Sequence, residues 1–302
     1  MILIADSGST KTDWILSQDS EVSEGKDRFY QFKTQGINPF HQTEEQIQNI
    51  LMNELMPELR FIFNSLDLPS DSSSMTETIE FLAFYGAGCN DATVSKMQKI
   101  FVRLLPKTKL EVAGDLLGAA RALLEDEAGV ATILGTGSNS CFYDGRTIVS
   151  NVPPLGYILG DEGSGASLGK LFMNGIFKGS LSKEIREEYL ESQRLTYNDV
   201  IERVYRQPLA NRFLASSAKF ILQHIDEPGM KELVMLNFDN FFKYNISHYD
   251  GLGKRAISSV GSIAFYFKDY FVEVANANNY KVDKIFCSPI ERMLDYHKKA
   301  RR

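Results

Sequence analysis

Two short turns rich in glycine, serine and threonine constrain the fold of this chain more than any other feature. The first lies at residues 6–12 and the second at 135–138, and each follows an apolar run with the composition of a buried strand. A further β-rich run follows each turn too closely for a helical crossover to intervene. Each turn therefore predicts the tip of an antiparallel hairpin.

The two halves of the chain open alike, which suggests an internal duplication. In both halves, strand, turn and strand are followed by more β structure and then by alternating helices and strands. In the first half we expect strands at 1–6, 12–18, 28–34, 79–85 and 110–113, and helices at 47–66 and 94–104. In the second half we expect strands at 130–134, 139–143, 146–150, 256–260 and 284–287. A chain of 302 residues is long enough for two domains.

Local signals predict several boundaries. Thr43 and Gln46 have the spacing of a capping box at the start of the first long helix. The serine-rich stretch 69–74 predicts a surface loop, and Gly129 predicts the left-handed end of a helix over 116–128. The region 165–248 is expected to be largely helical, with Phe241, Phe242 and Tyr244 in the core, and further helices are expected to about 276 and from 289.

Composition and charge restrict the class of partner. The net charge of -6 argues against nucleic acid or a membrane surface, both of which favour basic faces. The N-terminus has no basic segment before an apolar one, and no run approaches the roughly 20 apolar residues that span a bilayer, so we expect a cytoplasmic protein with a small-molecule substrate. The three cysteines (Cys89, Cys141, Cys287) and the four histidines are scattered, which predicts reduced thiols and no structural zinc.

The two turns are candidate phosphate-binding elements. Glycine allows close approach, and backbone N–H groups and hydroxyls are donors to phosphate oxygens. Either turn alone is explained as an ordinary hairpin turn, but the occurrence of both favours a nucleotide site. In the first turn, Asp6 ends a strand where a carboxylate could hold Mg²⁺ through water, and Lys11 adds a positive charge for a phosphate.

Three further polar residues each have a structural and a functional interpretation. Asp115 stands where a strand passes into a helix, so it is either an N-cap or a base that accepts a proton from an attacking hydroxyl. Asp161 either caps the following helix or accepts hydrogen bonds from sugar hydroxyls. Asn38, ahead of Pro39, is either a turn residue or a ligand of a hydroxyl or acetamido group. The glycines near Asp161 have neither dinucleotide-binding nor P-loop spacing.

The segments 6–13, 135–140 and 159–164 together resemble the family of N-acetylglucosamine kinases and BadF/BadG/BcrA/BcrD-type ATPases, in an order and spacing that extend over nearly the whole chain. The resemblance implies an α/β, two-lobed actin-hexokinase (ribonuclease H-like) fold, with a cleft between duplicated mixed β-sheet domains. The expected lobes are 1–115, completed by the C-terminal helix 289–302, and 116–288.

The resemblance also implies roles for individual residues. Asp115 would be the catalytic base, and Asp6 would hold Mg²⁺. The expected contacts to ATP are Gly8, Ser9, Thr10, Lys11, Gly135, Thr136 and Gly137, with Gly261 and Ser262 on the adenosine side. The expected contacts to the sugar are Asn38, Ser138, Asn139, Gly156 and Asp161. The chain differs from animal N-acetylglucosamine kinases at 153–156, where Pro-Pro-Leu-Gly replaces a Gly-Trp-Gly loop, and near Phe40.

We therefore expect an ATP-dependent kinase that converts an amino sugar, first of all N-acetylglucosamine, to its 6-phosphate. One alternative is the ATPase activator of a 2-hydroxyacyl-CoA dehydratase, which resembles this family and needs cysteine thiolates for an iron–sulfur cluster. The other is a nucleotide-dependent sensor without catalysis. The sequence does not decide the oligomeric state, and a homodimer is one option.

Overall fold

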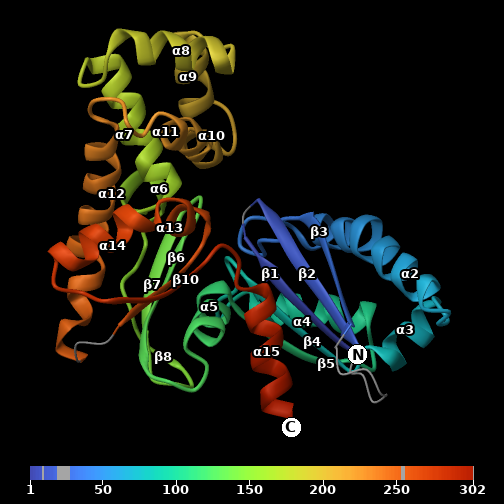
Figure 1. Ribbon diagram of the computed structural model, residues 1–302. Coiled ribbons are helices and arrows are strands. Elements are labelled where there is room, and N and C mark those ends of the chain that lie inside the picture. The colour runs from blue at the N-terminus through green and yellow to red at the C-terminus, as the bar shows by residue number, and fades with distance from the viewer. Residues whose placement is uncertain (9, 19–27, 253–255, 302) are drawn as a thin grey trace. The chain divides into compact units, whose positions relative to one another are not determined.

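The computed structural model describes residues 1–8, 10–18, 28–252 and 256–301 (Figure 1). The chain forms two compact units, Met1–Ala122 with Pro289–Arg302, and Leu123–Ser288. We call them unit 1 and unit 2. The boundary lies at Ala122, whereas the sequence predicts it at 115, because Ala122 packs into a core cluster of unit 1 together with Ile4 and Met293.

Unit 1 is built on a five-stranded mixed sheet in the order β3-β2-β1-β4-β5. The strands are β1 (Ile2–Ser7), β2 (Lys11–Gln18), β3 (Arg28–Gln35), β4 (Phe81–Gly86) and β5 (Lys109–Gly114). β2 runs antiparallel to both of its neighbours, β1 and β3, whereas β1, β4 and β5 are parallel to one another. The parallel strands therefore end at one edge of the sheet, beside the β1–β2 turn.

Both faces of this sheet are covered, which explains why β1 is an unbroken apolar run. Ile2 and Ile4 pack with Met293 on one face, and Leu3 and Ala5 belong to the cluster on the other. The helix α15 (Ile290–Arg301) packs against β1 and β2 and lies beside them in Figure 1. The helices of unit 1 are α1 (Glu44–Ile50), η1 (Leu51–Leu55), α2 (Met56–Ser65), α3 (Ser72–Thr78), α4 (Val94–Leu104), α5 (Asp115–Leu124) and α15 (Ile290–Arg301). The last two residues of α5 already belong to unit 2.

The long helix expected at 47–66 is divided by the π-helix η1. Its capping box is confirmed, since Thr43 accepts from the N–H of Gln46 and the Gln46 side chain accepts from the N–H of Thr43. Pro57 lies in the first turn of α2 and has no N–H for the carbonyl of Asn53 four residues earlier. A wide turn is a common response to such a missing bond.

Unit 2 repeats the topology of unit 1. Its five-stranded sheet has the order β10-β9-β6-β7-β8, with the β6–β7–β8 meander antiparallel and β6, β9 and β10 parallel. The strands are β6 (Gly129–Leu134), β7 (Ser138–Tyr143), β8 (Ile148–Asn151), β9 (Ile257–Val260) and β10 (Val282–Phe286). The predicted two-lobed, duplicated α/β architecture is thereby confirmed for the described residues.

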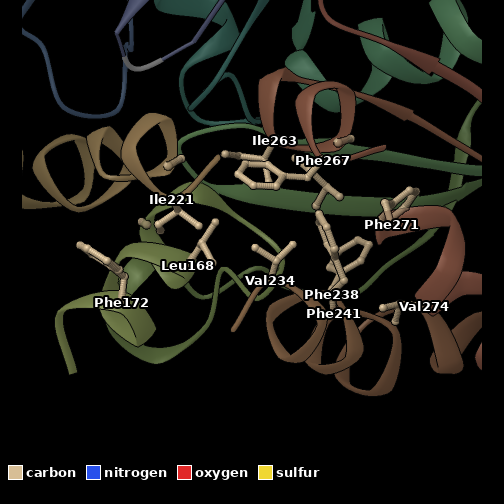
Figure 2. Packing of buried hydrophobic residues seen from close by; sticks show 14 of the residues in the cluster. Leu168, Phe172, Ile221, Val234, Phe238, Phe241, Ile263, Phe267, Phe271 and Val274 are labelled. Carbon is tan, nitrogen blue, oxygen red and sulfur yellow. The ribbon is translucent and has the colours of Figure 1, made fainter. Parts of the chain in front are cut away.

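The core of unit 2 lies between its sheet and a set of helices. Figure 2 shows apolar side chains of α7, α12, α13 and α14 packed together, among them Leu168, Phe238 and Phe271. The helices of unit 2 are α6 (Gly156–Leu159), α7 (Gly165–Lys178), α8 (Lys183–Gln193), α9 (Tyr197–Tyr205), α10 (Ala210–Ser216), α11 (Ala218–Gln223), α12 (Met230–Tyr244), η2 (Ile246–Leu252), α13 (Ser262–Tyr266) and α14 (Lys268–Ala277).

Three local predictions are wrong. The expected loop at 69–74 contains the start of α3, because Asp71 accepts from two N–H groups and caps it. Gly129 begins β6 and ends no helix, since α5 stops at Leu124 and Glu125 takes the left-handed conformation. Tyr244 is 50% exposed at the end of α12, although Phe241 and Phe242 are buried as expected. No described helix is long and apolar enough to cross a membrane.

Candidate active site

The first turn is closed by buried hydroxyl groups. The backbone N–H of Gly8 donates to the carbonyl of Lys11 over 3.0 Å, and the hydroxyls of Ser7 and Thr12 lie 2.6 Å apart. Thr12 also bonds to the carbonyl of Gln35 at 3.0 Å. These two hydroxyls therefore hold the hairpin and are not free to meet a phosphate. Thr10 is exposed at the tip, and the predicted phosphate ligand Ser9 lies outside the described residues.

Ser7 also fixes the segment that carries Asn38. Its hydroxyl bonds to the carbonyl of Ile37 at 2.9 Å and accepts from the N–H of Ile37 at 3.0 Å. All of these atoms are buried, so each hydrogen bond satisfies a group that would otherwise lose its partner on burial. This role of Ser7 and Thr12 is not evident from the sequence, because it depends on residues about 30 positions apart meeting in space.

Asn38 is held in a tight turn beside the first hairpin. Its Oδ1 accepts from the N–H of Phe40 at 3.0 Å, and its own N–H donates to the side chain of Gln42 at 2.7 Å. A Cβ at Gly88 would lie 2.2 Å from this Oδ1, so only glycine fits there. The structural role expected of Asn38 is thus realised by Oδ1, while Nδ2 bonds to no described residue.

Asp6 and Asp115 stand on the same edge of the sheet. Asp6 lies near the end of β1, and Asp115 directly follows β5, with β4 between the two strands. Burial raises the pKa of Asp115 to about 6, against the opposing hydrogen bond from the N–H of Leu116. Burial and then the nearby charges of Asp115 and Asp13 raise the pKa of Asp6 to about 7. The two carboxylates are therefore close enough to repel each other.

Lys11 pairs with another carboxylate in this structure. Its Nζ lies 2.5 Å from Asp13 Oδ2, and Lys33 lies 3.7 Å from the other oxygen of Asp13. Lys11 is half exposed, so a phosphate can still compete for it from solvent. The buried charge of Asp6 is left without a direct cationic partner among the described residues.

The second turn is uncharged and is braced by a helix. The N–H of Gly135 donates to the carbonyl of Gly137 at 3.0 Å. The first N–H groups of α7, from Gly165 and Ala166, donate to the carbonyls of Gly135 and Thr136 at 2.8 and 3.0 Å. A Cβ placed on Gly135 would meet no protein atom within 4 Å. One face of this turn is therefore open to a ligand within unit 2.

Asp161 lies directly beside this second turn. It adopts a left-handed φ of 57°, and its Oδ1 accepts from the N–H of buried Ser138 at 3.4 Å. A Cβ on Gly137 would lie only 3.0 Å from Asp161 Oδ2. Burial raises the pKa of Asp161 to about 6. The capping interpretation of Asp161 is wrong, because Ser164 caps α7 by accepting from the N–H of Ser167.

The other residues expected to contact the sugar surround the same turn or follow β8. Asn139 Oδ1 accepts from the N–H of Ser140 at 3.0 Å and from Asn151 Nδ2 at 2.9 Å. Gly156 has a φ of +73° and begins α6 directly after Leu155, which has a φ of 60°. The pair of left-handed residues turns the chain back, so that the carbonyl of Pro154 accepts from the N–H of Asp161 at 2.9 Å.

Gly261 supports the second turn from the neighbouring strand. Its φ is +118°, and a Cβ there would lie 2.3 Å from the carbonyl oxygen of Leu134. Both the backbone conformation and the close approach demand glycine. Ser262 is exposed at the first position of α13.

The cysteines occupy separate elements. Cys89 follows β4, and burial and then the charge of Asp115 raise the pKa of its thiol to about 12. Cys141 is buried in β7, where burial also raises its pKa to about 12, and Cys287 is exposed after β10. No group of three or more His, Cys, Asp or Glu side chains with metal-site geometry occurs in the described part of the chain.

The structure thus gathers the predicted residues into two sets. In unit 1, Asp6, Gly8, Lys11 and Asp115 lie along one sheet edge, and Asn38 is tied to that edge through Ser7. In unit 2, the second turn brings together Gly135, Thr136, Gly137, Ser138, Asn139 and Asp161, and Gly261 packs against it.

Solved structures match the chain over its full length. A candidate N-acetylglucosamine kinase from Porphyromonas gingivalis is 42% identical, with 100% of both chains covered and a TM-score of 0.89. A second candidate N-acetylglucosamine kinase, from Chromobacterium violaceum, is 15% identical over 98% of both chains, with a TM-score of 0.70. MreB 5 of Spiroplasma citri, bound to AMPPNP, is 10% identical over 99% of this chain and 95% of its own, with a TM-score of 0.51.

The last two similarities concern the fold alone. No protein-family model matches the chain, and no curated protein matches it. The 42% identity over the whole of both chains agrees with the motifs at the two turns and at Asp161. The chain belongs to the family of N-acetylglucosamine kinases and BadF/BadG/BcrA/BcrD-type ATPases, within the actin-hexokinase superfamily.

Proposed function

We propose that this protein is an ATP-dependent sugar kinase, and that its acceptor is an amino sugar, N-acetylglucosamine, which it converts to the 6-phosphate. The observation that carries the proposal is the pair of Asp6 and Asp115 at the end of parallel strands, each with a raised pKa. Phosphoryl transfer to an alcohol needs such a carboxylate as proton acceptor. The 42% identical relative, a candidate N-acetylglucosamine kinase, supports this choice of acceptor.

ATP is the proposed phosphoryl donor. Unit 1 would offer the backbone of Gly8 and the charge of Lys11 to its phosphates, and unit 2 would offer Gly135, Thr136 and Gly137. Gly261 and Ser262 would lie toward the adenosine. Support comes from the open face at Gly135 and from MreB 5, which has this fold and is bound to the ATP analogue AMPPNP.

Asp115 is the proposed base. Its pKa of about 6 leaves it mostly ionised at neutral pH yet basic enough to take a proton. The C6 oxygen of the sugar forms a bond to the γ-phosphorus while the bond from that phosphorus to the bridging oxygen breaks. The hydroxyl proton passes to Asp115, and ADP leaves with the bridging electron pair.

The sugar would be held by amides and a carboxylate. The Nδ2 group of Asn38, which bonds to no described residue, can donate to a hydroxyl or an acetamido oxygen. Asp161 can accept from two sugar hydroxyls, with Ser138, Asn139 and Gly156 nearby along the chain. Asp161 would act when ionised, and its raised pKa of about 6 permits that at neutral pH.

The donor set at Asp6 fits Mg²⁺. A hard divalent ion prefers carboxylate oxygen and keeps several waters. The pKa of Asp6 is raised by burial and by two neighbouring carboxylates, so a cation would offset an unfavourable negative charge. Asp6 would hold the ion through water, and the ion would neutralise charge on the phosphates.

An ADP-release assay over glucose, glucosamine, N-acetylglucosamine and N-acetylmuramic acid tests the proposal. We expect N-acetylglucosamine to stimulate ADP release most strongly, in the presence of Mg²⁺. Release without any dependence on sugar would overturn the assignment as a kinase. Stronger stimulation by a different sugar would retain the kinase and change its acceptor.

A further inference from the structure

A groove lined by amide side chains lies beside the Asn38 turn, wholly within unit 1. It has a volume of about 430 Å³, within the range of small-molecule pockets. Its lining comes from the end of β3, the turn that follows, α1 and the π-helix η1. The residues are Gln35, Gln42, Gln46, Asn49, Ile50, Asn53 and Glu54.

The chemistry of the groove favours a neutral polyhydroxylated ligand. The lining carries one carboxylate, Glu54, and no cation, which disfavours a phosphate or another anion. One oxygen of Glu54 already accepts from the N–H of Gln35 at 2.7 Å. Amides present donor and acceptor on one rigid plane, which suits hydroxyl and acetamido groups.

Several polar groups of the groove have no hydrogen-bond partner among the residues that the structure describes. The side-chain amides of Gln35, Asn49 and Asn53 make no hydrogen bond to another described residue, and Gln46 uses only its Oε1, which accepts from Thr43. Ile50 is 7% exposed and gives the groove an apolar floor. The wide turn of η1 lies next to these amides, and π-turns occur frequently at functional sites.

Residues that line the groove are hydrogen-bonded to the segment that carries Asn38, a candidate contact of the sugar. Gln42 accepts from the N–H of Asn38 at 2.7 Å and donates to the carbonyl of Gly36 at 3.0 Å. Glu54 holds Gln35, the residue just before Gly36. A sugar contacting Asn38 would therefore have its neighbouring unit next to the amides of the groove.

We infer that the groove binds a second neutral sugar unit, so that the preferred acceptor is longer than a monosaccharide. This inference rests on the proposed function, because it takes Asn38 as a contact of the phosphorylated sugar. Two or more new hydrogen bonds to neutral groups correspond to roughly a tenfold gain in affinity.

Calorimetric titration of the full chain without nucleotide tests the groove directly. The probes are N-acetylglucosamine and its β-1,4-linked dimer. We expect the dimer to bind about tenfold more tightly than the monomer. The double variant Asn49→Ala with Asn53→Ala should bring the dimer to the affinity of the monomer and leave monomer binding unchanged.

The two substitutions in the groove should leave the fold intact. Both asparagines are exposed and helical, where alanine is the more favourable residue. Asn64→Ala, an exposed asparagine on α2 outside the groove, is the matched control and should keep the preference for the dimer. Equal binding of the two sugars, or a preference that survives the double variant, would overturn the inference.

Phosphorylation kinetics separate this inference from the proposed function. If the protein phosphorylates N-acetylglucosamine but shows no preference for the dimer, the kinase assignment stands and the second sugar-binding position in the groove is refuted. If the double variant removes a preference for the dimer but neither sugar is phosphorylated, the sugar-binding groove stands and the kinase assignment is refuted.

Discussion

Units 1 and 2 share one sheet topology and one turn position, but the chemistry of their turns differs. The register places Asp6 in β1 where Ile133 stands in β6. The carboxylate of unit 2, Asp161, comes from a separate segment and meets its turn at Ser138 and Gly137. Duplication thus accounts for the shared backbone, and single side chains make the two turns chemically different. Under the proposed function, unit 1 would supply the acid–base group and unit 2 would bind phosphate through backbone groups.

The two turns are also stabilised differently. In unit 1, the hydroxyls of Ser7 and Thr12 close the hairpin and fix the Asn38 segment. In unit 2, Gly261 packs against the carbonyl of Leu134, and α7 donates to the turn carbonyls. Changes at equivalent places should therefore have different effects in the two units.

Removal of the charge of Asp115 should have the largest effect. The amide in Asp115→Asn has the shape of the carboxylate but cannot accept a proton, so turnover should fall about a thousandfold. ATP affinity, measured by calorimetry, should stay within about twofold. In the wild type, the rate should fall as the pH drops below about 6, because Asp115 becomes protonated. The control is exposed Asp91→Asn, and near-normal turnover in Asp115→Asn would refute this role.

Asp6→Asn should stabilise the free protein at alkaline pH. Burial and neighbouring carboxylates raise the pKa of Asp6 from 3.8 to about 7, so the folded chain binds this proton more tightly than the unfolded chain. Stability is therefore lost as the pH rises from about 4 to about 7. At about pH 8 we expect the variant to gain on the order of 2 kcal/mol in free energy of unfolding, and little at about pH 4.

Urea unfolding at both pH values measures this gain. Asp91→Asn again serves as a control, since exposed Asp91 should show no such pH dependence. An Asp6→Asn protein that is no more stable than the wild type at about pH 8 would show that Asp6 carries no buried charge.

Alanine at the turn glycines should weaken ATP binding without unfolding the protein. A Cβ at Gly135 meets no atom within 4 Å, and one at Gly8 meets only the carbonyl of Lys11 at 3.8 Å. If phosphates approach these atoms, each variant should lose roughly tenfold in ATP affinity, about 1.4 kcal/mol, with an unchanged Tm. Gly261→Ala should instead lower the Tm, because its Cβ would strike Leu134. An unchanged ATP affinity in Gly135→Ala would show that the nucleotide does not bind at the turn of unit 2.

A matched pair of Thr→Val variants should show the smallest effects. Thr12 and Thr132 are both buried, and each hydroxyl bonds to a serine hydroxyl. Each variant should lose about 1 kcal/mol of stability in thermal unfolding. Only Thr12→Val should also raise the KM for the sugar, by about two- to fivefold, because it loosens the Asn38 segment. An equal rise of the KM in Thr132→Val would show that the effect does not depend on the Asn38 segment.

Much of the fold can be predicted from the sequence because its signals are local. The short spacing between apolar runs indicates hairpins, and Thr43 with Gln46 gives the capping box. The start of α3 was missed because its serines look like a loop, although Asp71 caps them. The π-helix was missed because the apolar spacing tolerates a wide turn, and Pro57 was its only local signal.

The candidate site is less accessible to sequence reasoning. The sequence marks Asp6, Asp115 and the glycines, whose chemistry is evident from residue type and strand position. It does not show that Ser7 holds Ile37, that Gln42 holds Asn38, or that Ser164 takes the capping place considered for Asp161. Those contacts depend on side chains that meet only after the sheets form.

The central claim is that the γ-phosphate of ATP passes to a sugar hydroxyl. Phosphorus NMR of the protein with ATP, Mg²⁺ and N-acetylglucosamine tests it most directly. We predict ADP together with one new phosphomonoester signal that couples to the two C6 protons, and its loss in Asp115→Asn. ADP accompanied only by inorganic phosphate, with no sugar phosphate from any amino sugar, would contradict the account.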